Sequence, residues 1–150
     1  MARAIKLALA ALAIWLPAAA GSAGEEIRFV PVEIILDSPE PVAAWQFELA
    51  DRNESMKVVG VENGDSDAFA RAPYYDRGAI VRGDAERIVV ADYSLAEESR
   101  LPRGRIRVAT VHLMIEGEAD FELTLVTATT SDGRPIDASI SQQPLRTRER

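Results

Sequence analysis

Residues 106–115 read Ile-Arg-Val-Ala-Thr-Val-His-Leu-Met-Ile, and the pattern of this stretch decides the fold class. Every second side chain from Ala109 onward is apolar, so Ala109, Val111, Leu113 and Ile115 fall on one side of the chain. A period of two is typical of a half-buried β-strand, because successive side chains of a strand point to opposite faces. We therefore expect the longest strand of the chain here, with His112, the single histidine, on its more polar face.

The same period recurs on both sides of this stretch. Residues 30–36 and 44–49 alternate in the same way, and Trp45, Phe47 and Leu49 share the face expected to be buried. Further strands are expected over residues 56–61, 87–94 and 121–129, with short ones at 79–82 and 136–140, and one helical turn is expected before Pro102. Turn residues separate these segments, and Asp132-Gly133 suits a tight hairpin turn. Eight or nine short strands without a long helical stripe predict an all-β domain, and we expect an antiparallel jelly-roll β-sandwich.

The first residues indicate export. Arg3 and Lys6 precede and enter an apolar run over residues 5–17, and small residues follow at 18–24. This order predicts a signal peptide over residues 1–23, cut after Ala20 or Ala23, because a membrane span needs about 20 apolar residues. The expected location is extracytoplasmic, either periplasmic or secreted. A single domain is expected over residues 25–141, followed by a flexible polar tail over residues 142–150.

Charge and cysteine content exclude several function classes. The whole chain has 17 basic and 24 acidic residues, and residues 1–24 hold two of the basic ones, which leaves the exported part with a formal charge of −9. An acidic domain is poorly suited to nucleic acid or anionic lipid, since both require a positive patch. The chain has no cysteine, so neither a disulfide nor a thiolate ligand or nucleophile is available.

Catalytic motifs are missing from the sequence. A hydrolytic triad needs a histidine beside an exposed nucleophile, and neither a G-x-S-x-G arrangement nor a second histidine occurs. Asp92 lies in the apolar run 88–93 and is expected to be partly shielded from water, but a lone carboxylate does not make a glycosidase pair. The turn over residues 62–67 is rich in oxygen ligands without matching a calcium loop, so a solvated turn is favoured over a calcium site. We therefore predict no enzyme activity, no cofactor and no metal site.

Aromatic residues are the remaining candidates for binding. Tyr74, Tyr75 and Asp76 lie in an irregular stretch next to Pro73, and they are the predicted partner-binding residues. Adjacent strand residues point to opposite sides, so one tyrosine is expected to face the core and the other the solvent. An exposed tyrosine beside charged groups suits a protein interface or the stacking of a sugar ring.

The order of these patterns resembles the cohesin domain, the module that captures dockerin domains in cellulose-degrading assemblies and whose structural relatives include carbohydrate-binding modules. The segments that carry the resemblance are Val30-x-Val32, residues 44–49 followed by Asp51, residues 57–61, residues 88–94, residues 104–113, and residues 127–129 with Asp132-Gly133 and Ile136. His112 stands where an aromatic residue is common in the family. The resemblance implies an exported, non-catalytic module that binds a dockerin-like or other envelope protein. The alternative is a carbohydrate-binding module that recognises a polysaccharide, which would require two or three exposed aromatic residues in a plane.

Overall fold

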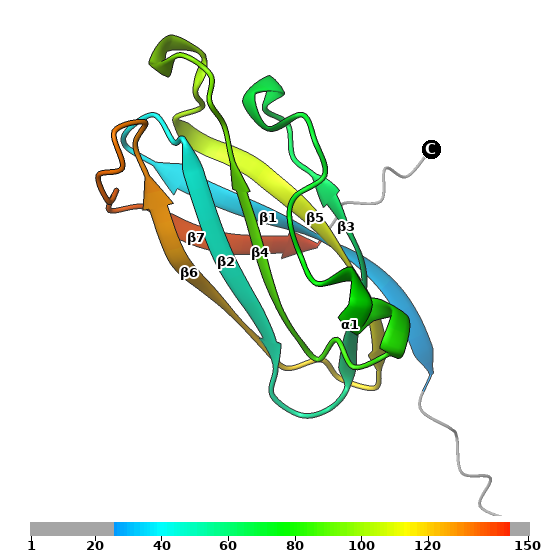
Figure 1. Ribbon diagram of the computed structural model, residues 1–150. Helices are drawn as coiled ribbons and strands as arrows, with labels where there is room; N and C mark the ends of the chain where they lie inside the picture. The colour runs from blue at the N-terminus through cyan, green and yellow to red at the C-terminus, as the bar shows by residue number, and fades with distance from the viewer. Residues whose placement is uncertain (1–25, 145–150) are drawn as a thin grey trace, which may run out of the picture.

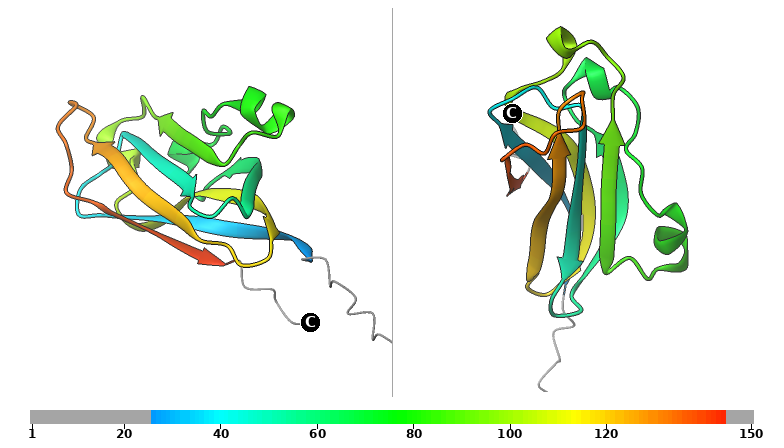
Figure 2. Two further views of the ribbon diagram at one scale, coloured as in Figure 1. Left: turned by 90° about the horizontal axis from the view of Figure 1, so that it is seen from below. Right: turned by 60° about the vertical axis from the view of Figure 1, so that its left-hand side comes forward.

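The computed structural model describes residues 26–144, which form two antiparallel sheets packed face to face (Figures 1 and 2). The strands of this part of the chain are β1 (Ile27–Ser38), β2 (Ala44–Asp51), β3 (Met56–Asn63), β4 (Arg87–Tyr93), β5 (Gly104–Glu116), β6 (Phe121–Thr129) and β7 (Ser139–Pro144). One sheet has the order β3-β5-β1-β7 and the other the order β4-β2-β6. The expected all-β class with two antiparallel sheets is confirmed. The predicted signal peptide over residues 1–23 lies outside the described residues.

Every connection between consecutive strands crosses from one sheet to the other. The odd-numbered strands β1, β3, β5 and β7 form one layer, and β2, β4 and β6 form the other. The longest pairing joins β1 to β5, from Ile27 opposite Glu116 to Ser38 opposite Gly104, with a bulge between Ile34 and Ile35. All strand pairing in the described chain is therefore non-local in sequence.

The core lies between the sheets and is built from the faces that the period of two marked as apolar. Trp45, Phe47 and Leu49 of β2 are fully buried, and Val111 and Leu113 of β5 face them from the other sheet. The Trp45 ring stacks on Phe47 with centroids 5.7 Å apart and meets Phe69 edge-on at 6.1 Å. The predicted core role of Trp45 is confirmed. Because no disulfide is available, the fold is stabilised by the burial of this continuous apolar layer.

Two short helical turns and one short helix lie outside the sheets. The 3₁₀ turns η1 (Asp67–Phe69) and η2 (Glu98–Arg100) lie at one end of the sandwich, and the helix α1 (Arg77–Arg82) lies at the other (Figure 1). The helical turn expected before Pro102 is confirmed by η2. No helix within residues 26–144 combines the length and the apolar character that crossing a bilayer requires.

The expected strand over residues 79–82 is wrong, because these residues belong to α1. Asp76 precedes the helix and accepts a hydrogen bond from the Ala79 N–H at 3.1 Å, which caps the first turn. Gly83, with a φ of 75°, ends the helix in the left-handed conformation that glycine adopts without strain. Residues 26–144 consequently contain seven strands instead of the eight or nine expected.

The Asp132-Gly133 turn forms as predicted, but the sheet closes later than predicted. Gly133 has a φ of 83° and donates to the Thr130 carbonyl at 3.0 Å, and the Ile136 N–H donates to the Ala128 carbonyl at 2.8 Å. The chain then leaves this sheet, and β7 begins at Ser139, which pairs with Asp37 of β1. Strand β7 continues through residues 142–144, which the sequence placed in the tail, and residues 145–150 lie outside the described part.

Candidate functional site

The outer face of the β4-β2-β6 sheet carries polar, charged and small apolar side chains. Residues that face outward lie in rows across the three strands, as the register shows. One row is Ala91, Gln46 and Thr127, and the next is Val89, Glu48 and Thr124. Glu48 accepts a hydrogen bond from Arg87 at 2.7 Å. A face of this mixed polarity suits contact with another protein surface.

Two exposed tyrosines lie at the β4 edge of this face. Tyr74 exchanges two backbone hydrogen bonds with Ala91, of 2.8 and 3.0 Å, and thereby extends the sheet by one residue beyond β4. Its ring stacks on that of Tyr93 with centroids 6.0 Å apart and planes 8° apart. Tyr74 is 51% exposed and Tyr93 is 47% exposed. The Arg71 guanidinium lies 5.6 Å from the Tyr74 centroid and 5.7 Å from that of Tyr93. We call Tyr74 and Tyr93 the tyrosine pair.

The three residues predicted to bind a partner have different positions. Tyr74 belongs to the exposed tyrosine pair, whereas Tyr75 is partly buried against the core with Arg77 above its ring at 5.3 Å. The expectation that the two tyrosines point to opposite sides is confirmed. Asp76 caps α1 and lies 3.6 Å from Arg82. The structure therefore brings Tyr74 alone among the three into the tyrosine pair.

Sequence reasoning missed Tyr93 and Arg71. In β4 the buried residues are Ile88, Val90 and Asp92, so the alternation itself places Tyr93 on the outer face. That signal was present in the sequence. Arg71 lies in an irregular stretch between η1 and Tyr74, and no periodic pattern assigns its side chain to the neighbouring rings.

A recess of about 360 Å³ lies beside the tyrosine pair. It is lined by residues 67–71, which include η1, and by residues 92–95 at the end of β4. Asp92 is only 4% exposed, as the sequence suggested, and its Oδ1 accepts a hydrogen bond from the Tyr93 N–H at 2.8 Å. Its Oδ2 has no hydrogen-bond partner within residues 26–144, and neither has Nε1 of Trp45, which lies opposite Asp92 on β2. Burial raises the pKa of Asp92, while the Tyr93 N–H and the charge of Arg71 act in the opposite direction. We call this cavity the Asp92 recess.

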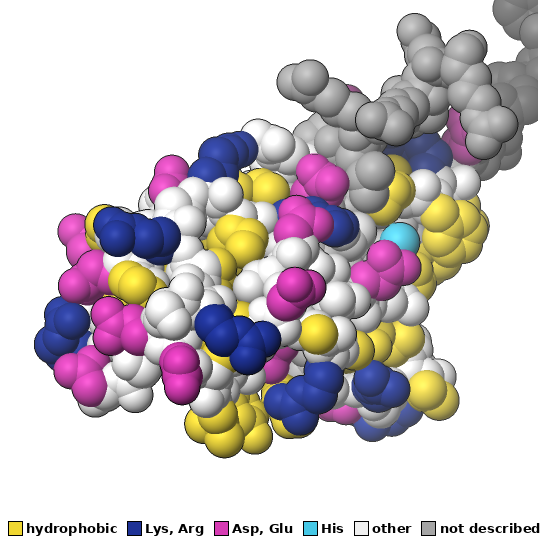
Figure 3. Space-filling model, turned by 90° about the horizontal axis from the view of Figure 1, so that it is seen from above, with side chains coloured by type: hydrophobic (Ala, Val, Ile, Leu, Met, Phe, Trp, Pro, Cys, Tyr) yellow, Lys and Arg dark blue, Asp and Glu magenta, His cyan; other side chains and the backbone are white. Residues whose placement is uncertain are grey.

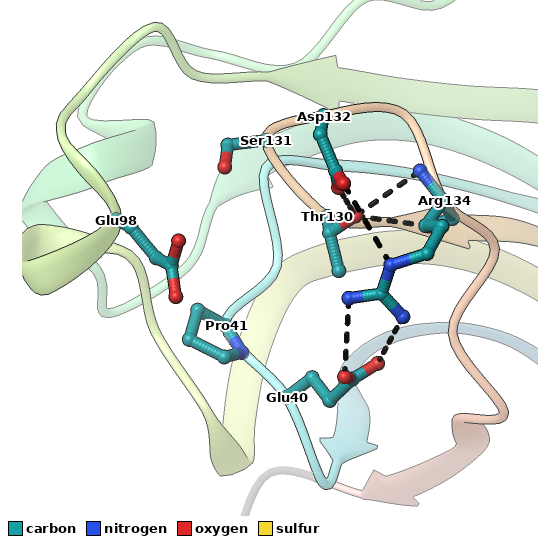
Figure 4. Close-up of a pocket in the computed structure, with 7 residues that line it drawn as sticks. All are labelled: Glu40, Pro41, Glu98, Thr130, Ser131, Asp132 and Arg134. Carbon is teal, nitrogen blue, oxygen red and sulfur yellow. Dashed lines mark hydrogen bonds and ion pairs between the residues drawn. The ribbon is translucent and has the colours of Figure 1, made fainter.

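A second pocket, of about 190 Å³, contains three charged groups that pair with one another, Glu40, Asp132 and Arg134 (Figure 4). Arg134 points its guanidinium at Glu40, with N–O distances of 3.3 and 3.4 Å, and its Nε lies 3.7 Å from Asp132. The Thr130 hydroxyl donates to Asp132 and lowers the pKa of that carboxyl, and the hydrogen bond to Glu40 raises the pKa of Arg134. These contacts tie the turn over residues 130–134 to the β1–β2 connection. We therefore interpret these charged residues as a structural contact between two loops and not as a binding site.

In the oxygen-rich turn over residues 62–67, the side chains of Asp65 and Ser66 form hydrogen bonds with neighbouring groups of the protein. Asp65 accepts hydrogen bonds from the Arg107 guanidinium, and the Ser66 hydroxyl caps η1 through the Ala68 N–H at 3.2 Å. Glu62 lies 3.1 Å from Nε2 of His112, in a geometry outside that of a hydrogen bond. Within residues 26–144, no three histidine, aspartate or glutamate side chains converge as metal ligands would.

Charges of both signs are interspersed over the end of the molecule that carries η1 and η2, with apolar side chains exposed between them (Figure 3). This end has no extended basic patch of the kind that nucleic acid requires.

Comparisons with protein-family models, with curated proteins and with solved structures found no match to this chain.

Proposed function

We propose that this chain is an exported, non-catalytic protein-interaction module with a cohesin-like jelly-roll fold. Its partner is a dockerin-like or other envelope protein, and the contact surface is the outer face of β4-β2-β6 together with the tyrosine pair. The jelly-roll assignment is supported by the crossing of every strand connection between the two sheets.

The observation that carries the proposal is the row of exposed apolar and aromatic side chains along the β4 edge. Tyr74, Val89, Tyr93 and Leu95 all lie there, and Leu95 is 92% exposed. Tyrosines next to an arginine are common anchors of protein interfaces, because they bury a large contact area at a small entropic cost.

The same contacts favour a protein over a polysaccharide. A sugar ring stacks on a free aromatic face, and two or three such faces in one plane are needed for a chain of sugars. Here the rings of Tyr74 and Tyr93 stack on each other, and Arg71 lies over both. Trp45 and Phe69, which lie close to this region, are both buried.

A pull-down with residues 25–150 as bait, from the envelope and secreted fractions of the source cell, tests the proposal. We expect the wild-type domain and the control Phe29→Ala to retain the same protein, since Phe29 is 71% exposed but lies on β1 in the other sheet. The double variant Tyr74→Ala/Tyr93→Ala should lose it. A retained protein with paired calcium-loop repeats, released by chelation, would identify a dockerin-type partner. Retention of the protein by the double variant, or retention of polysaccharide by the wild type, would overturn the proposal.

A further inference from the structure

The tyrosine pair holds a positive charge that has no anionic partner in the described part of the chain. The Arg71 guanidinium lies 5.6 Å from the Tyr74 centroid and 5.7 Å from the Tyr93 centroid. Arg71 is exposed, and no carboxylate of residues 26–144 lies within ion-pair distance of it. Its N–H groups are therefore open to a group that approaches from outside.

The guanidinium lies alongside the two rings, close to a phenol oxygen. The ring centroids are 6.0 Å apart and the guanidinium is almost equally far from both, so it lies beside the stack and not between the rings. The Tyr93 side chain, followed by the charge of Tyr74, raises the pKa of Arg71, which places the Tyr93 oxygen near the guanidinium. A phenol that accepts a hydrogen bond still has its own O–H to donate. Arg71 and Tyr93 thus present N–H and O–H donors next to each other at the surface.

A carboxylate is the group that suits these donors. It has two acceptor oxygens, and the planar guanidinium presents pairs of N–H groups that match them. Other arginines of this chain already make such pairs, Arg52 with Glu122 at 2.9 Å and Arg87 with Glu48 at 2.7 Å. The contacts with both rings restrict the Arg71 side chain before binding, so less conformational entropy is lost than for an unrestrained arginine.

Two acidic side chains reduce the long-range field of Arg71. Asp67 and Asp92 line the Asp92 recess together with Arg71. Asp92 is buried and its Oδ1 accepts a hydrogen bond from the Tyr93 N–H, whereas Asp67 is exposed. With one cation and two acids in the recess, long-range attraction of an anion is weak. Binding of an anion therefore depends on direct hydrogen bonds from Arg71 and Tyr93.

We infer that Arg71 and the hydroxyl of Tyr93 bind a carboxylate, the side chain of an aspartate or glutamate that the protein partner presents to the tyrosine pair. The source of the carboxylate rests on the proposed function, whereas the affinity of the two residues for a carboxylate does not. A partner seated on the exposed rings and on Leu95 would exclude water from this ion pair and so strengthen it. The partner surface is then acidic opposite Arg71 and apolar around that position.

The test is an NMR titration of the ¹⁵N-labelled domain (residues 25–150) with sodium acetate at pH 6.5 and constant ionic strength, followed at the arginine Nε–Hε signals. Arg100 is the internal control, because it is exposed and has neither an ion pair nor an aromatic ring as partner within residues 26–144. We expect acetate to bind at Arg71 about fivefold more tightly than at Arg100, the usual effect of one additional hydrogen bond. Tyr93→Phe, which keeps the ring, should remove this difference, whereas Tyr75→Phe should preserve it. Acetamide, which lacks the charge, should shift the Arg71 signal far less.

Equal acetate affinity at Arg71 and Arg100, an unchanged Arg71 affinity in Tyr93→Phe, or equal shifts with acetamide would overturn the inference. The comparison of the two arginines uses the wild-type domain alone, so it decides the question even if a variant does not fold. Failure of this titration would leave the pull-down result standing, and failure of the pull-down would leave the titration standing.

Two further probes test the source of the carboxylate, the peptide acetyl-Ala-Glu-Ala-amide and galacturonate, an acidic sugar. We expect the peptide to bind more tightly, because Tyr74 and Tyr93 stack on each other and do not offer a free pair of ring faces to a sugar. Tighter binding of galacturonate would assign the site to an acidic polysaccharide and overturn the assignment to a protein side chain.

Discussion

At the scale of single residues, Asp92 is a buried carboxyl with one oxygen that has no hydrogen-bond partner within the described residues. The period of two directs it inward with Ile88 and Val90, next to the indole of Trp45. The sequence placed it in an apolar run and so predicted its shielding. The unmet oxygen could not be predicted, because it depends on which side chains of η1 and β2 surround the carboxyl in three dimensions.

The free energy of unfolding should depend on pH through Asp92, because ionisation of this buried carboxyl destabilises the fold. Burial raises its pKa in the folded state above the ordinary aspartate value of 3.8. The stabilising contribution of the group is therefore complete below that ordinary value and is lost as the pH rises through the folded pKa. Asp92→Asn should be more stable than the wild type at pH 7, and the difference should shrink and vanish as the pH falls toward 3.8. Urea unfolding followed by Trp45 fluorescence at several pH values measures this difference. A wild-type domain that is the more stable of the two at pH 7 would refute the assignment.

At the scale of elements, the strands were predictable and the helix was not. Alternation over residues 30–36, 44–49 and 106–115 identified β1, β2 and β5, because every second side chain along each of them faces the core. The alternation did not predict that residues 34–36 of β1 and 108–111 of β5 are buried on both faces. Helix α1 is too short for a helical period to show in its sequence. The cap at Asp76 and the glycine at position 83 were the available signals. Pairing partners could not be predicted either, because every strand pairs with segments distant in sequence.

The cap of α1 gives a prediction at this scale. Short helices are not stable by themselves, so α1 depends on its terminal contacts and on the burial of Ala79. Asp76→Ala should lower the free energy of unfolding by about 1 kcal/mol, the usual value of a helix N-cap. It should leave partner retention unchanged, because Asp76 contacts Arg82 and the helix instead of the tyrosine pair. Chemical denaturation and the pull-down check the two parts. If Asp76→Ala abolished partner retention without lowering the free energy of unfolding, Asp76 would have a direct role in binding and this prediction would be wrong.

At the scale of the whole molecule, stability rests on one apolar layer between two sheets. Without cysteine, no covalent cross-link can supplement it. Phe47 lies at the centre of this layer, fully buried and stacked on Trp45. Phe47→Ala should cost about 3–5 kcal/mol, a large part of the stability of a small domain. Denaturant unfolding measures the loss, with Phe29→Ala as the exposed phenylalanine that should change stability far less. A loss below about 1 kcal/mol for Phe47→Ala would contradict the described core.

The surfaces that stabilise the fold differ from the surface that we propose for binding. The buried faces hold the sheets together, and the surface proposed to bind a partner, the outer face of β4-β2-β6 with the tyrosine pair, lies on the opposite side of one of these sheets. Half of this site could be read from the sequence, since Tyr74 was named from its irregular surroundings. Tyr93 joins it only because the backbone of Tyr74 pairs with Ala91, a contact between segments that the local pattern does not connect.

The affinity of the purified partner for three forms of the domain tests this account most directly. The forms are the wild type, Tyr74→Ala/Tyr93→Ala and the control Phe29→Ala, each first shown to be folded. We predict that the tyrosine double variant loses about 2 kcal/mol of binding free energy, roughly 30-fold in Kd, as expected for interface anchors, while the control binds like the wild type. Wild-type affinity in the double variant would place the interface away from the tyrosine pair, and a loss confined to Phe29→Ala would place it on the opposite sheet; either result would contradict the account.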